Sequence, residues 1–429
     1  MDNKRWVLGL ASVASFMVAL DAMVVTMALS KIKVDLGAGL EQLEWTANAY
    51  SLTFAVLLMP AAAVGDRFGR RRMFVSGIAL FLLASVACAT VPDIGLLIAA
   101  RALQGAGAAL VMPLAIALLS TAYPPQERAG ALGVFSGITG VAVLAGPMVG
   151  GAVTEGLAWQ WIFWINVPIA LALIPLVLLK VGESRGPVHP IDYAGVALVA
   201  VGGLGLVWGL VRGEFLVSLV VGVPLLALYV GRERELFRIR AFSSGVLATL
   251  ALYGTIYGSL FFVGQFGSPL EAAVRMIPWT VPMFVVAPLA GRLVSRIGER
   301  PLVAGGLALQ AVGMGWMALT VTPTANVVAP LLLAGIGASM AMPGTQNAVL
   351  SSVAPAFIGK ASGIFSTVRQ FAGAFGVAVL AVVFTSFGGY GSAEAYSAGL
   401  GPVCAVAAVL SLVGAVAGLG TAVRELQKA

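Results

Sequence analysis

The feature that most constrains this chain is a succession of apolar stretches, each roughly 20 residues long, along nearly its whole length. Hydrophobic residues fill 60% of the 429 positions and charged residues only 10%, which is more apolar surface than a soluble core could enclose. An apolar helix of about 20 residues crosses the hydrocarbon layer of a bilayer, about 30 Å thick. The net charge of +7 does not indicate a nucleic-acid binder, because a soluble protein of that class would not carry such stretches. The sequence therefore predicts an all-α membrane protein.

Charged residues and clusters of proline and glycine divide the apolar stretches into 14 predicted transmembrane helices. The first stretch contains Asp21 and lacks a small-residue cleavage signal at its end, so it is predicted to be a retained span and not a signal peptide. The predicted spans begin near Trp6, Trp45, Met73, Ile94, Ala129, Trp159, Ile191, Phe215, Ser243, Arg275, Leu302, Asn326, Lys360 and Ser397.

Lysine and arginine are distributed unevenly between the two sides of the predicted bundle. If the N-terminus is cytoplasmic, 19 of the 25 basic residues fall in cytoplasmic segments, and only Lys31, Lys33, Arg212 and Arg275 lie outside. Cytoplasmic connections of membrane proteins carry such an excess of positive charge. An even number of spans puts both termini on one side, so both termini are predicted to be cytoplasmic, with the chain in the inner or plasma membrane of the cell.

The connection after the second predicted span recurs later in the chain. Residues 65–71 read Gly-Asp-Arg-Phe-Gly-Arg-Arg, and the related segment Ser-Arg-Ile-Gly-Glu-Arg occupies residues 295–300. Internal repeats of this kind build the two bundles of alternating-access proteins. The sequence therefore predicts two six-helix bundles, residues 1–186 and 235–429, joined by a two-helix linker pair at residues 187–234.

The repeated connections are predicted to act as gates on the cytoplasmic side, although anchoring by positive charge alone would also explain their composition. Ser295 replaces Asp66 in the second copy, so a charge-based lock is expected to be stronger in the N-terminal half. The predicted gating residues are Gly65, Asp66, Arg67, Gly69, Arg70, Arg71, Arg296, Gly298 and Arg300.

Asp21 is the only acidic residue that falls well inside a predicted span, and Arg101 and Arg369 are the basic ones. An ionisable group in hydrocarbon is costly unless it is functional or paired. Asp21 is therefore predicted to carry a proton, with a structural ion pair as the alternative. Counting along the helices puts Asp21 about 12 Å and Arg101 about 10 Å below the outer surface, so the two can lie in one layer. Gln104 follows Arg101 at helical spacing and can supply a hydrogen bond.

The fifth predicted span has a surface of small residues. Its Gly-Pro-x-x-Gly-Gly pattern consists of Gly146, Pro147, Gly150 and Gly151. Small residues let helix backbones approach closely and proline bends a helix, which suits a sliding contact between helices. Ordinary helix packing explains the same pattern.

Together these segments resemble the 14-span drug:proton antiporter branch of the major facilitator superfamily, over nearly the whole chain. Residues 65–71 resemble its loop between spans two and three, residues 101–107 its span-four motif, residues 146–151 its span-five antiporter motif, and residues 159–168 the start of its span six. The resemblance implies that Arg101 takes part in proton transfer, that span five forms a hinge and seal, and that the proton gradient supplies the energy without a cofactor.

Polar and aromatic side chains within the spans are candidates for contact with a transported molecule, although most of them are expected to serve packing. Arg369 and Gln370 also resemble an Arg-Gln pair of the same family. The candidates are Trp45, Asn48, Tyr50, Gln104, Tyr253, Tyr257, Phe261, Gln265, Trp279, Asn347, Arg369 and Gln370.

A single buried carboxylate balances one positive charge, so the expected cargo is small and lipophilic, either neutral or monocationic. The predicted function is proton-coupled efflux of such molecules, including drugs, by a monomer that works by alternating access in contact with membrane lipids. No nucleic acid, metal or cofactor is expected. An exporter of a lipid or a self-made metabolite on the same fold is one alternative, and a non-transporting membrane sensor or scaffold is another. An enzyme is not predicted, since the sequence has no phosphate-binding Gly-Lys-Ser/Thr loop, metal cluster or catalytic triad.

Overall fold

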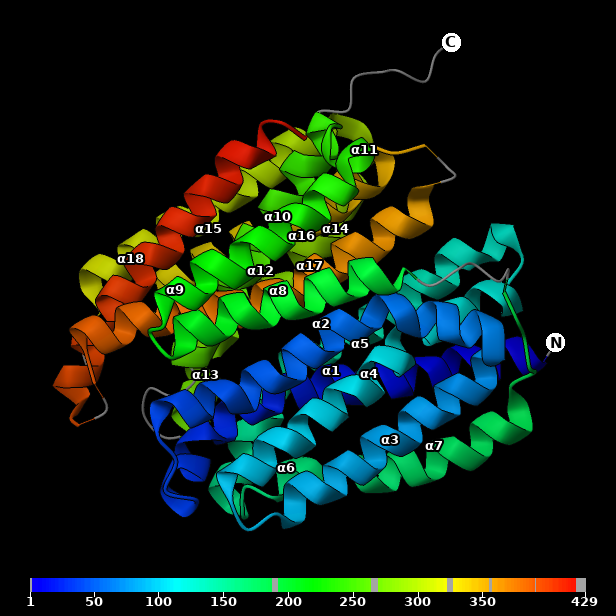
Figure 1. The fold of residues 1–429 in the computed structure, drawn as a ribbon, viewed down its shortest axis with the longest axis horizontal. Helices are drawn as coiled ribbons and strands as arrows, with labels where there is room; N and C mark the ends of the chain where they lie inside the picture. The colour runs from blue at the N-terminus through cyan, green and yellow to red at the C-terminus, as the bar shows by residue number, and fades with distance from the viewer. Residues whose placement is uncertain are drawn as a thin grey trace. The chain divides into compact units, whose positions relative to one another are not determined.

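The computed structural model describes residues 2–186, 192–263, 269–321, 327–354, 357–389 and 391–421, and within these ranges every regular element is a helix (Figure 1). The chain forms two compact units, which are described one at a time. The first comprises Met1–Val196 and Gly267–Ala273, and the second comprises Ala197–Phe266 and Val274–Ala429. The prediction of an all-α protein is confirmed for the described residues.

Within the described residues, the first unit contains seven helices, the start of an eighth and the first residues of α13. They are α1 (Asp2–Asp35), α2 (Leu40–Phe68), α3 (Arg70–Thr90), α4 (Ile94–Ala122), α5 (Pro125–Gly156), α6 (Trp161–Trp164), α7 (Asn166–Lys180), the beginning of α8 (Tyr193–Val211) and the beginning of α13 (Pro269–Thr280).

The second unit continues α8 and α13 and contains the remaining helices. They are α9 (Phe215–Val217), the π-helix η1 (Ser218–Gly222), α10 (Val223–Arg232), α11 (Arg234–Phe237), α12 (Arg240–Val263), α14 (Pro282–Ile297), α15 (Glu299–Thr320), α16 (Val328–Ser351), α17 (Ile358–Phe387) and α18 (Ala393–Gly418).

Twelve of the described helical segments are long and apolar enough to cross a membrane, and a thirteenth is α2 when its two bent parts, Leu40–Leu58 and Pro60–Phe68, count as one span. The bend of 53° falls at Pro60, which has no backbone N–H to donate and whose ring clashes with the preceding turn. The structure thus supports 12 or 13 candidate spans and does not show the 14 that the sequence predicts. The fifth predicted span coincides with α5, which is not among the 12 or 13.

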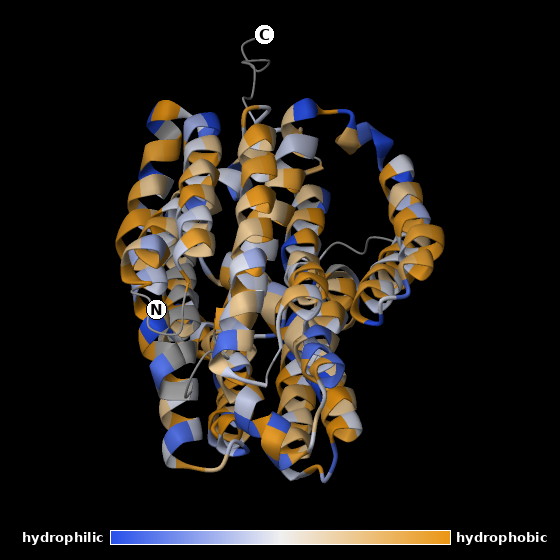
Figure 2. Ribbon diagram, turned by 90° about the vertical axis from the view of Figure 1, so that its left-hand side faces the viewer, coloured by the Kyte–Doolittle hydropathy of each residue, from blue (hydrophilic) through white to orange (hydrophobic). Residues whose placement is uncertain are grey.

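Large apolar side chains cover much of the outer surface. Leu319 is 89% exposed, Leu179 77% and Leu83 68%, which water would disfavour and lipid accommodates. Figure 2 shows hydrophobic residues along the lengths of the helices and hydrophilic residues at many of their ends. This distribution is typical of a protein that spans a membrane.

The helices of the first unit pack through faces of small and apolar residues. α3 buries side chains three or four positions apart, including Phe74, Phe81 and Ser85, against α4 and α7. α2 approaches α4 so closely that a methyl group at Gly105 would lie 2.4 Å from the carbonyl oxygen of Tyr50. These contacts bring the polar residues of α1, α2, α3, α4 and α7 into one layer.

Candidate functional site

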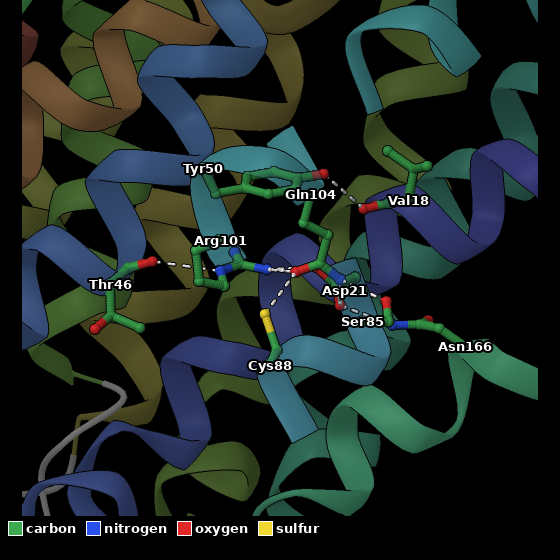
Figure 3. A network of polar contacts seen from close by, with 9 residues as sticks. All are labelled: Val18, Asp21, Thr46, Tyr50, Ser85, Cys88, Arg101, Gln104 and Asn166. Atoms are coloured by element: carbon green, nitrogen blue, oxygen red, sulfur yellow. Dashed lines mark hydrogen bonds and ion pairs between the residues drawn. The ribbon is translucent and has the colours of Figure 1, made fainter. Parts of the chain in front are cut away.

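Asp21 and Arg101 form an ion pair inside the first unit. Asp21 on α1 is 2% exposed and Arg101 on α4 is 1% exposed. The Nη1 of Arg101 donates to the Oδ2 of Asp21 at 2.6 Å (Figure 3). The shared depth inferred from the helical rise therefore corresponds to direct contact between the two side chains.

Two amides complete the surroundings of the Asp21 carboxylate. The Nε2 of Gln104 and the Nδ2 of Asn166 each donate to its Oδ1 at 2.8 Å. Both amide nitrogens also donate to the Oγ of Ser85, at 2.8 Å and 3.4 Å. All four side chains are buried, so water does not compete for these bonds.

Arg101 is held on every side by the first unit. Its Nη1 also donates to the Oε1 of Gln104 at 2.6 Å, and its Nε donates to the backbone oxygen of Thr46 at 3.3 Å. Its guanidinium lies over the ring of Tyr50, 4.3 Å from the centroid. The hydroxyl of Tyr50 in turn donates to the backbone oxygen of Val18 on α1 at 3.3 Å. The guanidinium position is therefore fixed by α1, α2 and α4 together.

Asn166 and Ser85 are site residues that the sequence analysis did not single out. Asn166 begins α7 directly after the break that separates it from α6, and Pro168 lies two positions further on. A proline there cannot continue the hydrogen bonds of an unbroken helix from α6, which favours the break. Asn166 falls in residues 159–168, so the family resemblance was the signal available for it. Nothing in the sequence marked Ser85, which lies on the buried face of α3 among apolar neighbours.

Glu44 is another buried carboxylate, one turn inside the start of α2, where the sequence analysis expected no span. Glu44 is 2% exposed on α2, which begins at Leu40 and not near Trp45 as predicted. The helix extends beyond the apolar stretch because the side chain of Gln42 accepts a hydrogen bond from the backbone N–H of Gly39 at 2.9 Å. The Oε2 of Glu44 has no hydrogen-bond partner in the described structure.

Asn48 follows Glu44 by one helical turn, is 1% exposed and has neither of its amide atoms hydrogen-bonded in the described structure. At about 100° per residue, Glu44 and Asn48 point away from the side of α2 that carries Thr46 and Tyr50. The two residues are therefore separate from the Asp21 cluster.

The first copy of the repeated connection is tied down within the first unit. The Nε of Arg70 donates to the Oδ1 of Asp66 at 2.7 Å. The carboxylate of Glu183, which follows α7, accepts from the backbone N–H of Arg71 at 3.0 Å and of Arg72 at 3.3 Å, so it binds the positive N-terminal end of α3. Glu183 is a further residue that the sequence analysis missed. Arg67 and Gly65 lie in the last turns of α2.

The second copy repeats the backbone turn but not the ion pair. Gly69 and Gly298 both have positive φ, +109° and +79°, and each lies between two helices where glycine is favoured. Arg296 and Arg300 are exposed. Glu299 accepts hydrogen bonds from Asn347 at 2.6 Å and from Ser351 at 3.2 Å. Asn347, predicted for the substrate cavity, thus lies at this end of α16.

The glycines of α5 pack against α1. A methyl group at Gly146 would lie 2.3 Å from the Cβ of Met23, and one at Gly150 would lie 2.9 Å from the backbone oxygen of Val24. Gly151 is buried in the same helix, and Pro147 belongs to α5, although its side chain lies outside the described part. The small residues therefore allow α5 to approach the helix that carries Asp21.

The remaining cavity candidates are distributed between the two units. In the first, Trp45 is half-buried. In the second, Phe261 and Trp279 are almost fully buried, Gln370 is half-buried, and Arg369 lies near Tyr253 and Tyr257. Gln265 lies outside the described residues.

Comparisons with known proteins agree with this fold and site. The model of the Major Facilitator Superfamily matches residues 11–377 and 241–422. The tetracenomycin C resistance and export protein of Streptomyces glaucescens is 32% identical over 87% of this chain and 75% of its own length. The multidrug resistance protein Stp of Mycobacterium tuberculosis is 31% identical over 87% of this chain and 74% of its own length.

A solved structure supports the fold. The crystal structure of a bacterial homologue of the human lysosomal transporter Spinster matches with a TM-score of 0.73 and 18% identity, over 98% of this chain and 97% of that one. These comparisons confirm the expectation of a membrane transporter and not an enzyme, and they relate the chain to drug-efflux proteins. The chain belongs to the Major Facilitator Superfamily.

Proposed function

We propose that this transporter exports small lipophilic or monocationic molecules in exchange for protons, with Asp21 as the proton carrier. The observation that carries the proposal is the Asp21 carboxylate, which is buried and shares its two oxygens among Arg101, Gln104 and Asn166. The names of the export and multidrug relatives support drugs or antibiotics as cargo.

The hydrogen bonds to Asp21 link its protonation to the positions of the neighbouring side chains. An ionised carboxylate only accepts hydrogen bonds, whereas a protonated one carries an O–H that must donate. Both oxygens of Asp21 face N–H donors, Oδ2 from Arg101 and Oδ1 from Gln104 and Asn166. A proton on either oxygen therefore conflicts with at least one donor, and the group that loses its acceptor has to move.

The groups that must respond belong to different helices. Arg101 and Gln104 lie on α4, Asn166 lies at the start of α7, and Asp21 lies on α1 against the glycines of α5. Protonation therefore favours a different packing of these helices, as alternating access requires. We include in the proposal the 14-span topology, cytoplasmic termini, a monomeric state and gates at residues 65–71 and 296–300.

A lipid or a self-made metabolite is the competing cargo, and a membrane sensor without transport is the competing class. A carboxylate buried with its partners favours transport over the sensor, since a scaffold needs no ionisable group in hydrocarbon. The two cargo classes, drugs and lipids or metabolites, are distinguished by which compounds the purified protein transports.

The test is a flux measurement on purified protein in liposomes with an imposed pH gradient. Neutral, monocationic and lipidic compounds are loaded, and release is followed together with proton uptake into the same vesicles. We expect release of neutral and monocationic drugs that stops when a protonophore abolishes the gradient. Release of the lipidic compounds alone would favour the competing cargo, and no release of any compound would contradict transport.

A further inference from the structure

Arg369 is a second arginine that lies well inside a helix of the bundle, on α17 about a third of the way along its 30 residues. In the described part of the second unit, every carboxylate lies at or beside a helix end, and Arg369 forms no ion pair with any of them. These carboxylates are Glu214, Glu233, Glu235, Glu299 and Glu394. Arg369 is partly buried, and a cation in low-dielectric surroundings is costly without a counter-charge.

Among the described residues, Arg369 has fewer partners around its guanidinium than Arg101. Arg101 has a carboxylate, an amide oxygen, a backbone oxygen and a tyrosine ring around its guanidinium. Arg369 has the ring of Tyr253, 5.9 Å from its guanidinium carbon, and a hydrogen bond to the Tyr253 side chain, while its buried Nε has no hydrogen-bond partner in the described structure. The Nε–H of Arg369 is therefore a donor that the described protein groups leave unused.

The packing of α12 against α17 fixes two aromatic rings beside this guanidinium. A methyl group at Gly376 would lie 2.1 Å from the backbone oxygen of Gly254, so the two helices touch through their backbones. Tyr253 and Tyr257 lie one turn apart on α12, with stacked rings whose centroids are 6.2 Å apart and whose planes differ by 25°. Gly373, one turn beyond Arg369, leaves room for the ring of Tyr257.

We propose that Arg369, Tyr253 and Tyr257 form a binding site for the carboxylate of an aromatic cargo molecule. The planar guanidinium binds a carboxylate through two parallel N–H···O bonds, and this pairing supplies the counter-charge that the second unit lacks. The tyrosine rings present π-faces and edges on which an aromatic ring packs. The inference rests on the proposed export function and extends the cargo from neutral and monocationic molecules to aromatic monoanions.

The test compares two ligands that share the naphthalene ring and differ in charge: naphthoate and its neutral methyl ester. Their affinities are measured by calorimetric titration of the purified protein in lipid nanodiscs, with empty nanodiscs as the blank. The readout is the ratio of the two affinities, because a general loss of packing affects both ligands alike. The control variant is Arg212→Gln, which removes a cation that is 44% exposed in the connection after α8.

We expect Arg369→Gln to weaken naphthoate binding about tenfold or more, the range of a lost charge-assisted hydrogen bond, with the ester changed by less than about threefold. Arg369→Lys keeps the charge but loses the planar fork, so the affinity ratio should fall by about threefold or more. Arg212→Gln should match the native protein. If Arg369→Gln does not yield folded protein, Arg369→Lys carries the test by the same ratio.

An unchanged ratio in the Arg369 variants would overturn the proposal, as would equal weakening of acid and ester, which would make Arg369 a packing residue. Failure of the native protein to bind naphthoate would also overturn it while leaving drug efflux intact. Failure of the proposed function is distinguishable, because it is read from drug release in liposomes and not from naphthoate binding.

Discussion

Replacing Asp21 with asparagine keeps the size of the side chain and removes its charge. The native carboxylate accepts from Arg101 at 2.6 Å, and neither residue is more than 2% exposed. The variant leaves the guanidinium buried beside a neutral amide, and removing one partner of a buried ion pair costs about 3–5 kcal/mol. The new NH2 group also has to face donors from Arg101, Gln104 or Asn166. We expect a lower thermal midpoint and no gradient-driven export.

A second substitution separates the loss of stability from the loss of coupling. In the double variant Asp21→Asn with Arg101→Gln, the stranded charge is gone, so most of the thermal stability should return while proton coupling does not. Thermal unfolding in detergent gives the stability, and drug release measured together with proton uptake in liposomes gives the coupling. Asp35→Asn is the matched control, because it lies at the exposed end of the same helix and an amide oxygen can still accept from the Nε1 of Trp159.

The reasoning fails if Asp21→Asn still exchanges drug for protons. It also fails if Asp21→Asn is as stable as the native protein, since the ion pair would then contribute nothing.

Three further outcomes follow from the topology and the packing. Single reporter tags at the two ends of the chain should both be cytoplasmic, and an external C-terminal tag would contradict an even number of spans. Asp66→Asn removes the 2.7 Å ion pair with Arg70. It should slow transport several-fold, because a partly exposed pair contributes about 1 kcal/mol or less, while drug affinity stays within about twofold. An unchanged transport rate would exclude a gate. Gly105→Ala places a methyl group 2.4 Å from the carbonyl oxygen of Tyr50 and should destabilise the protein by about 1–3 kcal/mol, whereas Gly9→Ala, with nothing within 4 Å, should not. Equal midpoints for the two alanine variants would show that α2 and α4 are not in close contact.

The pairing of Asp21 with Arg101 was within reach of the sequence because the rise of a helix is fixed, so depth follows from counting residues. Rotation about the helix axis is less certain, since an apolar helix has little contrast between its faces. For this reason Ser85 on α3 could not be assigned to the site, and neither could the backbone oxygen of Thr46.

The ends of the helices were the second feature that the sequence did not predict correctly. Glu44 was placed outside its span because the apolar stretch begins after it, whereas the helix begins at Leu40 through a local hydrogen bond of Gln42. Asn166 reaches Asp21 because the chain breaks between α6 and α7, which hydropathy does not register. The repeated turns at Gly69 and Gly298 were easier to predict, since positive φ restricts these positions mainly to glycine.

The way in which Asp21 shares its oxygens also affects how tightly proton entry is coupled to cargo export. Oδ2 accepts from α4 alone, whereas Oδ1 accepts from α4 and α7, so a proton on Oδ1 affects both helices in the same step. Packed interfaces switch between discrete arrangements and do not deform gradually. Loosening an outer contact such as the bond from Asn166 to Ser85 would let the carboxylate gain or lose its proton without moving both helices. The result would be a leak, in which protons enter without cargo leaving and the stoichiometry of exchange drifts although no residue that touches the cargo has changed.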